Sequence, residues 1–274
     1  MPLTDPLPSL EEIIDSIGIG GRRLADIDAT EGGAGNISVC IGWPIEVRRQ
    51  FPVSEEIELP LAAPNLPGHT VLVTGSGRRL RDLDRLPLES IGAVAIHADG
   101  VHGTLYTAAV RQFDVLTSEW NSHLAVHDDT VARTGTNFHA VVHAQPPHLV
   151  YLSHRPEYQD EELFSRRLIR WQPETIVQLP AGIGILPFML PSSDELSEAT
   201  VESLREHRIT VWSKHGVMAR SDISVTRAVD RIEYAEAGGR YEYMDLMAGG
   251  GGEGLTDEES AEMVKVFGIE TKLF

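Results

Sequence analysis

Histidines at the ends of two apolar segments are the residues in this sequence best suited to chemistry. His143 and Gln145 stand two apart, so in an extended strand their side chains share one face and could enter one site. His215 follows a second apolar segment and precedes Gly216, which permits a tight turn. Imidazole is the commonest protein ligand for a borderline divalent metal such as zinc. A lone histidine is more often structural, so both interpretations stay open here.

A second polar group, Thr117-Ser118-Glu119, stands at the expected start of a helix. The first turn of a helix exposes unpaired N–H groups, and the helix dipole favours an anion there. In a structural interpretation these residues cap the helix and place an acidic side chain in its first turn. In a functional one, Thr117 and Ser118 hold a phosphate or carboxylate, while Glu119 is an acid/base group or a metal ligand.

Two glycine-bearing loops could add an anion site, because consecutive backbone N–H groups in such loops can face an anion. The first loop, residues 32–38, includes Gly35 and Asn36, and the second ends in Ser76-Gly77. Neither loop ends in the Gly-Lys-Ser/Thr of a nucleotide-binding P-loop. Each is equally compatible with an ordinary turn.

Apolar periodicity predicts the elements that position these residues. Strands are expected at 37–41, 56–61, 70–74, 93–98, 103–107, 140–143, 175–179, 209–212 and 217–219, with Asp99-Gly100 as a hairpin turn. Helices are expected at 9–26, in one or two pieces because of its glycines, at 117–133, 147–153 and 160–171, and beginning near 194 and 223. Regular βαβ alternation is missing, so the pattern favours a three-layer α/β/α fold around a mainly antiparallel sheet.

Composition limits the classes of function. The 274 residues carry 23 Lys and Arg against 41 Asp and Glu, a formal charge of −18, so attraction to nucleic acid or an anionic membrane is not expected. A phosphate site would have to form locally against this field. Cys40 is the only cysteine, which excludes an intramolecular disulfide, and no apolar run approaches a membrane span. We expect a cytoplasmic globular protein with a domain at 1–248 and a glycine-rich linker and C-terminal tail at 249–274.

Together and in this order, the motifs resemble those of the class II aldolase/adducin family. They are Gly35-Asn36-x-Ser38, Thr74-x-Ser76-Gly77, Ser118-Glu119, the His143 strand and Lys214-His215-Gly216, within roughly residues 10–247. Each motif is weak alone, and their order and spacing carry the resemblance. Three stretches are most similar to the rhamnulose-1-phosphate aldolases of that family: Thr117-Ser118-Glu119, Pro173-Glu174-Thr175 and residues 182–191.

The resemblance implies a homotetramer of α/β subunits with active sites at subunit boundaries. It implies a divalent metal, usually zinc, held by three histidines, two of which match His143 and His215. The implied reaction is reversible retro-aldol cleavage of a ketose 1-phosphate, with L-rhamnulose 1-phosphate giving dihydroxyacetone phosphate and L-lactaldehyde as the first expectation. Glu119 matches the acid/base residue, and Glu174 matches a catalytic position that approaches from a neighbouring subunit. The matches to substrate and phosphate contacts are Gly35, Asn36, Ser76, Gly77, Thr117 and Ser118.

Two positions depart from the family pattern. Gln145 stands where the third histidine is expected, and an amide oxygen is a poorer zinc ligand, so affinity could fall or the preference could move to a harder ion such as manganese. Gly33 stands where the nearest relatives have an asparagine that contacts the substrate. Glu119 could complete the metal shell, His139 or His148 could replace the missing imidazole, or the site could be degraded.

Other interpretations remain open. His123 and His127 are four residues apart on one expected helix and could hold a metal, although helices carry such pairs by chance. The chain could act on a non-phosphorylated hydroxy-oxo compound with a pyruvate-type donor, without using the phosphate contacts. A sugar-phosphate epimerase fits less well, because Glu119 and Pro173-Glu174 match the aldolases. Outside enzymes, the alternative is an adducin-like interaction module, with Gln145 as the mark of a lost metal.

Overall fold

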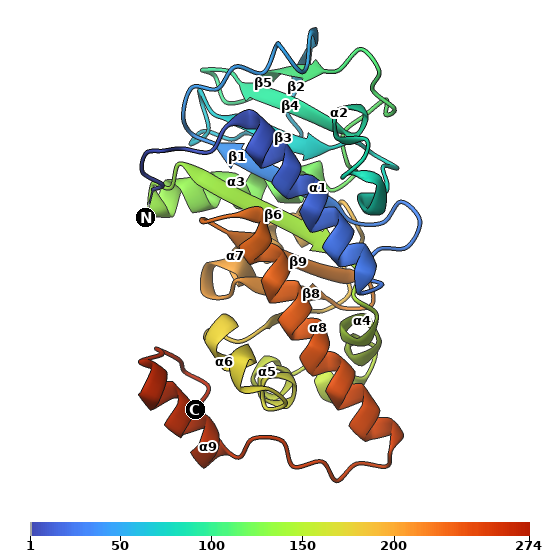
Figure 1. Ribbon diagram of the computed structural model, residues 1–274, viewed down its shortest axis with the longest axis vertical. Coiled ribbons are helices and arrows are strands. Elements are labelled where there is room, and N and C mark those ends of the chain that lie inside the picture. The colour runs from blue at the N-terminus through green and yellow to red at the C-terminus, as the bar shows by residue number, and fades with distance from the viewer. Residues whose placement is uncertain (1) are drawn as a thin grey trace.

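The computed structural model describes residues 2–274 and joins its strands in one nine-stranded sheet (Figure 1). The strand order is β2-β5-β4-β3-β1-β6-β9-β8-β7, and every neighbouring pair is antiparallel except β7 and β8. The strands are β1 (Asn36–Ile41), β2 (Val53–Glu58), β3 (Thr70–Thr74), β4 (Ile91–Ile96), β5 (His102–Thr107), β6 (Phe138–Ala144), β7 (Gly184–Leu186), β8 (Ile209–Trp212) and β9 (Gly216–Ser221). The mainly antiparallel sheet of the α/β fold is confirmed.

Helices cover both faces of the sheet and make three layers. Helices α1 and α8 pack together on one face, and α3 and α7 pack together on the other (Figure 1). The helices are α1 (Leu10–Asp26), α2 (Pro87–Ser90), α3 (Trp120–Thr134), α4 (Pro147–Ser153), α5 (Glu161–Ile169), α6 (Pro173–Gln178), α7 (Asp194–Glu206), α8 (Val225–Met247) and α9 (Asp257–Phe267).

Strand β1 lies between β3 and β6, and its side chains alternate between two different environments. Ile37 and Val39 enter the large apolar core beneath α1 and α8. Ser38 points to the other face, where it contacts α3. The strand is buried along its whole length, so its polar residues must be satisfied inside the protein.

Helix α1 is one continuous helix, which is the first of the two possibilities expected for this segment. A capping box between Ser9 and Glu12 starts the helix. The glycines allow the segment that follows β3 to lie close against α1, because a Cβ on Gly21 would stand 2.4 Å from the Leu80 carbonyl oxygen. Close packing against this segment offsets the low helix propensity of glycine.

Residues 175–179 were expected as a strand, but residues 175–178 belong to helix α6 and Leu179 caps its C-terminal end. Pro173 occupies the first turn, where its missing N–H costs nothing, and Thr175 and Ile176 bury one side of the helix. Helix α6 packs against α8 and α9, so tertiary contacts decide its conformation. The short strand β7, which follows α6, was not expected from the sequence.

The C-terminal segment folds back onto the rest of the chain. A glycine-rich stretch, residues 249–254, leads to α9, which has a capping box of Thr256 and Glu259 and packs against α6. Leu273 is 9% exposed and joins the large core. That residues 1–248 fold as a domain by themselves stays a prediction. Across residues 2–274, no helix combines the length and apolar character needed to span a membrane.

Candidate metal centre and active site

Strand β6 places His143 in a buried site between the sheet and α3. The ring is 1% exposed and stacks on Trp212 with 4.8 Å between ring centroids. Its Nδ1 lies 2.8 Å from the Val217 carbonyl oxygen, which can only accept, so Nδ1 carries the hydrogen. Burial lowers the pKa of His143. The neutral ring therefore presents a bare Nε2 to the site.

The turn between β8 and β9 brings His215 to within 5.0 Å of the His143 ring, centroid to centroid. Lys214 adopts a left-handed conformation, with φ of +66°, and its N–H donates to the Ser153 hydroxyl over 2.8 Å. Gly216 is needed because a Cβ there would stand 2.5 Å from the Ala144 carbonyl oxygen. The glycine and the strained turn together set the position of His215.

Glu119 is the third member of the group and lies immediately before α3. Helix α3 begins at Trp120 and not at Thr117 as expected. One carboxylate oxygen lies 3.5 Å from His143 Nε2, and the other lies 3.3 Å from His215 Nε2. The Asn36 amide donates to the first oxygen over 2.8 Å. Although burial opposes it, hydrogen bonds with His215 and Asn36 help to lower the pKa of Glu119 to about 2, so the carboxylate is ionised.

The three side chains fit a divalent cation. The bare Nε2 of His143 faces an ionised carboxylate, and two electron-rich groups in this arrangement repel each other unless a cation or proton lies between them. Two imidazole nitrogens and one carboxylate oxygen are a ligand set that zinc uses. Potential ligand atoms of Glu119, His143 and His215 all lie within 4.8 Å of one another, and no other such group of His, Cys, Asp or Glu occurs in residues 2–274.

Gln145 lies beside this group, one residue beyond the end of β6. Its backbone N–H donates to the Ala29 carbonyl oxygen over 2.8 Å. Its Cγ would be 3.2 Å from a Cβ on Gly216, so the half-buried side chain borders the turn that carries His215. That Gln145 binds the metal stays a prediction.

Neither alternative imidazole occupies the place of the missing third histidine. His139 shares the face of β6 with His143, but its Nδ1 lies 2.8 Å from His127 Nδ1. The Nδ1 of His148 is hydrogen-bonded to the carboxylate of Glu236 on α8. Of the alternatives considered from the sequence, the geometry favours a shell that includes Glu119.

The two glycine loops and the segment before α3 meet beside Asn36 and Glu119. Strand β3 holds them together: the Thr74 hydroxyl accepts from the Ile37 N–H over 3.2 Å, and the Thr74 carbonyl accepts from the Thr117 N–H over 3.1 Å. A Cβ on Gly33 would be 3.2 Å from the Gly77 carbonyl oxygen, so the two loops touch.

The predicted substrate contacts form a rim that is partly open to solvent. Ser76, Gly77 and Ser118 are exposed, whereas Thr117 is buried. Gly35 has φ of +84°, a conformation that favours glycine. A small ligand could reach the rim from solvent and still approach the buried Glu119.

Sequence reasoning missed the arginines that follow Gly77. Arg78 donates to the Ser90 hydroxyl and the Gln112 carbonyl, and Arg81 donates to the Thr30 carbonyl just before the first glycine loop. The signal was present as a run of basic residues, Arg78, Arg79 and Arg81, in an otherwise acidic chain. They supply the local positive charge that a phosphate site would require.

Glu174 is exposed in the first turn of α6, and it does not join the group around Glu119 within one chain. Helix α6 packs against α5, α8 and α9. The catalytic role expected for Glu174 stays a prediction.

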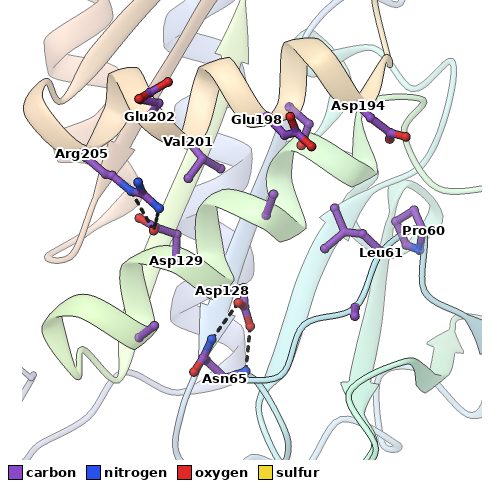
Figure 2. A pocket seen from close by; sticks show the side chains of 14 residues that line it. Pro60, Leu61, Asn65, Asp128, Asp129, Asp194, Glu198, Val201, Glu202 and Arg205 are labelled. Atoms are coloured by element: carbon purple, nitrogen blue, oxygen red, sulfur yellow. Dashed lines mark hydrogen bonds and ion pairs between the residues drawn. The ribbon is translucent and has the colours of Figure 1, made fainter.

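A hollow of about 730 Å³ between α3 and α7 lies apart from this site (Figure 2). Asp128 is turned to Asn65 and Asp129 to Arg205 (Figure 2). Asp194, Glu198 and Glu202 also line it, so the hollow would repel a phosphate. It contains neither Glu119 nor the two histidines beside it.

Residues 20–241 match the family model of the class II aldolase and adducin N-terminal domain. The chain therefore belongs to this family, and it is an enzyme, a lyase. A rhamnulose-1-phosphate aldolase of Bacteroides thetaiotaomicron is 32% identical over 264 residues, which cover 96% of each chain. One from Klebsiella pneumoniae is 29% identical over 214 residues, 78% of this chain and 76% of its own. The solved sugar-phosphate aldolase from Thermotoga maritima has a TM-score of 0.75 and 27% identity, covering 89% of this chain and 99% of its own.

Proposed function

We propose that this chain is a metal-dependent aldolase that reversibly cleaves a ketose 1-phosphate. The first substrate to test is L-rhamnulose 1-phosphate, which would give dihydroxyacetone phosphate and L-lactaldehyde. The convergence of Glu119, His143 and His215 on one cation-sized space carries the proposal. The similarity to rhamnulose-1-phosphate aldolases of Bacteroides and Klebsiella supports the choice of substrate.

The proposed cofactor is a divalent metal held by His143, His215 and Glu119, with Gln145 as a further ligand. Zinc suits the imidazoles, and the amide oxygen makes manganese or another hard ion an alternative. The metal would supply Lewis-acid stabilisation of the negative charge that develops on the substrate oxygens. No Schiff-base lysine is then required.

Glu119 is the proposed acid/base group. In the cleavage direction the C–C bond breaks, its electron pair stays with the phosphate-bearing fragment, and the hydroxyl proton leaves as the aldehyde forms. Glu119 would bind the metal in the resting state. In the reaction its carboxylate would accept that proton and deliver a proton to the carbon whose bond was broken. Its position before α3 keeps the carboxylate inside the protein while its neighbour Ser118 faces solvent.

The phosphate is proposed to bind at the rim formed by Gly35, Ser76, Gly77, Thr117 and Ser118, with Asn36 beside it. The exposed hydroxyls and the nearby arginines support this placement in a chain of net charge −18. Gly33 offers no side chain to a substrate, which keeps a non-phosphorylated substrate as the second candidate.

We further propose a cytoplasmic homotetramer in which Glu174 approaches the site of a neighbouring subunit. The exposure of Glu174 at the start of α6 supports a position at such a boundary. The oligomeric state can be measured by sedimentation of the purified protein.

The test is an assay of the purified protein against a panel of ketose 1-phosphates, with coupled detection of dihydroxyacetone phosphate. We expect cleavage that a chelator abolishes and that zinc or manganese restores, with Glu119→Gln as the inactive control. Activity that persists when Thr117 and Ser118 are both changed to Ala would point to a non-phosphorylated substrate. If the wild-type protein contains no bound metal and cleaves none of the substrates, the aldolase proposal is refuted and an interaction module is favoured.

A further inference from the structure

A line of buried polar side chains leads away from Glu119 between the sheet and α3. Asn36 donates from its amide nitrogen to Glu119, and its amide oxygen lies 2.5 Å from His123 Nε2. The Ser38 hydroxyl lies 2.6 Å from His123 Nδ1 and 2.7 Å from His127 Nε2. The other ring nitrogen of His127, Nδ1, lies 2.8 Å from His139 Nδ1. We call Asn36, His123, Ser38, His127 and His139 the histidine chain.

The histidine chain is sealed from solvent. Asn36 is 7% exposed, and Ser38 and the three histidines are 0% exposed. Burial lowers the pKa of His123 to about 3 and holds the pKa values of His127 and His139 well below the ordinary value. The three rings are therefore neutral, so each has one N–H and one bare nitrogen.

The direction of the hydrogen bonds can be deduced from the ionised Glu119 carboxylate. An ionised carboxylate only accepts, so Asn36 must turn its N–H2 group to Glu119 and its carbonyl to His123. The carbonyl also only accepts, so the His123 hydrogen is on Nε2. The bare Nδ1 of His123 then accepts the hydroxyl hydrogen of Ser38.

The remaining links follow from the orientation of Ser38. Its oxygen accepts from His127 Nε2–H, and the bare Nδ1 of His127 accepts from His139 Nδ1–H. His139 Nε2 has no hydrogen-bond partner within residues 2–274, which agrees with a bare nitrogen at the end of the series. Every donor in the histidine chain therefore points toward Glu119.

We propose that the histidine chain positions Glu119 by fixing the orientation of the Asn36 amide. If Ser38 lost its hydroxyl, His123 could move its hydrogen to Nδ1 and Asn36 could reverse. The carbonyl oxygen of Asn36 would then face the Glu119 carboxylate and repel it. The histidine chain does not conduct protons to Glu119, because the Asn36 amide between His123 and Glu119 keeps its hydrogens. Asn36, Ser38 and the three histidines are thus positioning residues.

This inference rests on the proposed function, in which Glu119 is the acid/base group, so its test includes measurements that need no substrate. The first is NMR of the zinc-loaded protein with 15N-labelled histidines, assigned by single substitutions. We expect the hydrogen on Nε2 in His123 and His127 and on Nδ1 in His139. A hydrogen on Nδ1 of His123 would overturn the proposal, whatever the enzymatic activity.

The second measurement compares Ser38→Ala with Ser38→Thr, which keeps a hydroxyl at the same position in a strand. In Ser38→Ala we expect zinc affinity, measured by chelator competition, to fall by about 10-fold or more, as when a group that orients a metal ligand is lost. We expect kcat to fall by at least about 10-fold while KM changes little, and Ser38→Thr to restore both properties.

The matched control is Ser165→Ala in α5, because Ser165 is also buried and makes two hydrogen bonds, both to Ile183. It should lower thermal stability like Ser38→Ala but keep zinc affinity and kcat. Unchanged zinc affinity in a folded Ser38→Ala variant would contradict the positioning role. The wild-type protein could show the expected histidine tautomers and a zinc affinity that depends on Ser38, yet have no lyase activity. That result would refute the proposed function but would still support the positioning of Glu119.

Discussion

A Cβ on Gly216 would stand 2.8 Å from Cε1 of His143, so the ring of His143 packs directly on the backbone at Gly216. This contact joins the two histidines of the site, because Gly216 also ends the turn that carries His215. Gly216→Ala should force the ring or the turn to move, at a cost of about 1–3 kcal/mol in stability. We expect the metal content per chain, measured by elemental analysis, to fall strongly in a variant whose circular dichroism is unchanged. Full metal content would show that the contact does not position the ligands.

Glu119→Gln should leave the fold intact and remove most of the activity. The glutamine keeps the size of the side chain and can still accept from Asn36, but it cannot take up a proton at neutral pH. A fall in kcat of about 10²-fold to 10⁴-fold is expected for loss of an acid/base group. The check is steady-state kinetics at saturating metal, so that weaker binding of the cation does not account for the loss. Activity within a few-fold of the wild type would exclude Glu119 as the acid/base group.

Gln145→His should tighten zinc binding, by at least about 10-fold, because imidazole is a better zinc ligand than an amide oxygen. Competition with a chelating dye measures the change. Gln145→Ala is the matched comparison: if the amide is a ligand in the wild type, the alanine variant should bind zinc more weakly. Equal affinity in the wild type and Gln145→Ala would show that Gln145 is only a neighbour of the site.

Stability should fall as the pH drops below about 6.5. The pKa values of His123, His127 and His139 are lowered by burial, so these rings stay neutral in the folded protein and gain protons on unfolding. The stability they contribute is complete above the unfolded pKa and is lost as the pH falls toward their folded values. Between pH 7.5 and 5.5 the loss should approach about 4 kcal/mol for the three rings.

Urea denaturation at fixed protein concentration measures this dependence on pH. His139→Leu removes one of the three groups and should reduce the slope by about one third. A free energy of unfolding that is the same at pH 7.5 and 5.5 would contradict the neutral state of the rings.

Removal of residues 249–274 should lower the melting temperature by at least about 5 °C. Leu273 is buried in the large core, and Met263, Val264 and Ile269 pack against it, so truncation would expose apolar surface around α6. Thermal unfolding of the full chain and of a chain ending at residue 248 gives the comparison. Equal melting temperatures would support residues 1–248 as an independent domain.

The sequence alone was sufficient for the fold class and for most elements. The apolar run in Thr70–Thr74 and the apolar residues of Pro147–Ser153 predicted β3 and α4 with their observed bounds, because each is a short apolar segment with a signal in its own residues. The order of the motifs also predicted the family that the comparisons report.

Tertiary structure decided what depends on contacts between distant segments. Residues 175–179 have a strand-like composition, but packing on α8 and α9 makes residues 175–178 part of α6. His123 and His127 have the spacing of a metal pair, yet Ser38 on β1, more than 80 residues away, satisfies both rings. The placement of Glu119 beside His143 and His215 likewise depends on the packing of α3 on β6 and on the close approach at Gly216. Local periodicity encodes elements, whereas the distances that make a site arise only when the sheet and helices have packed.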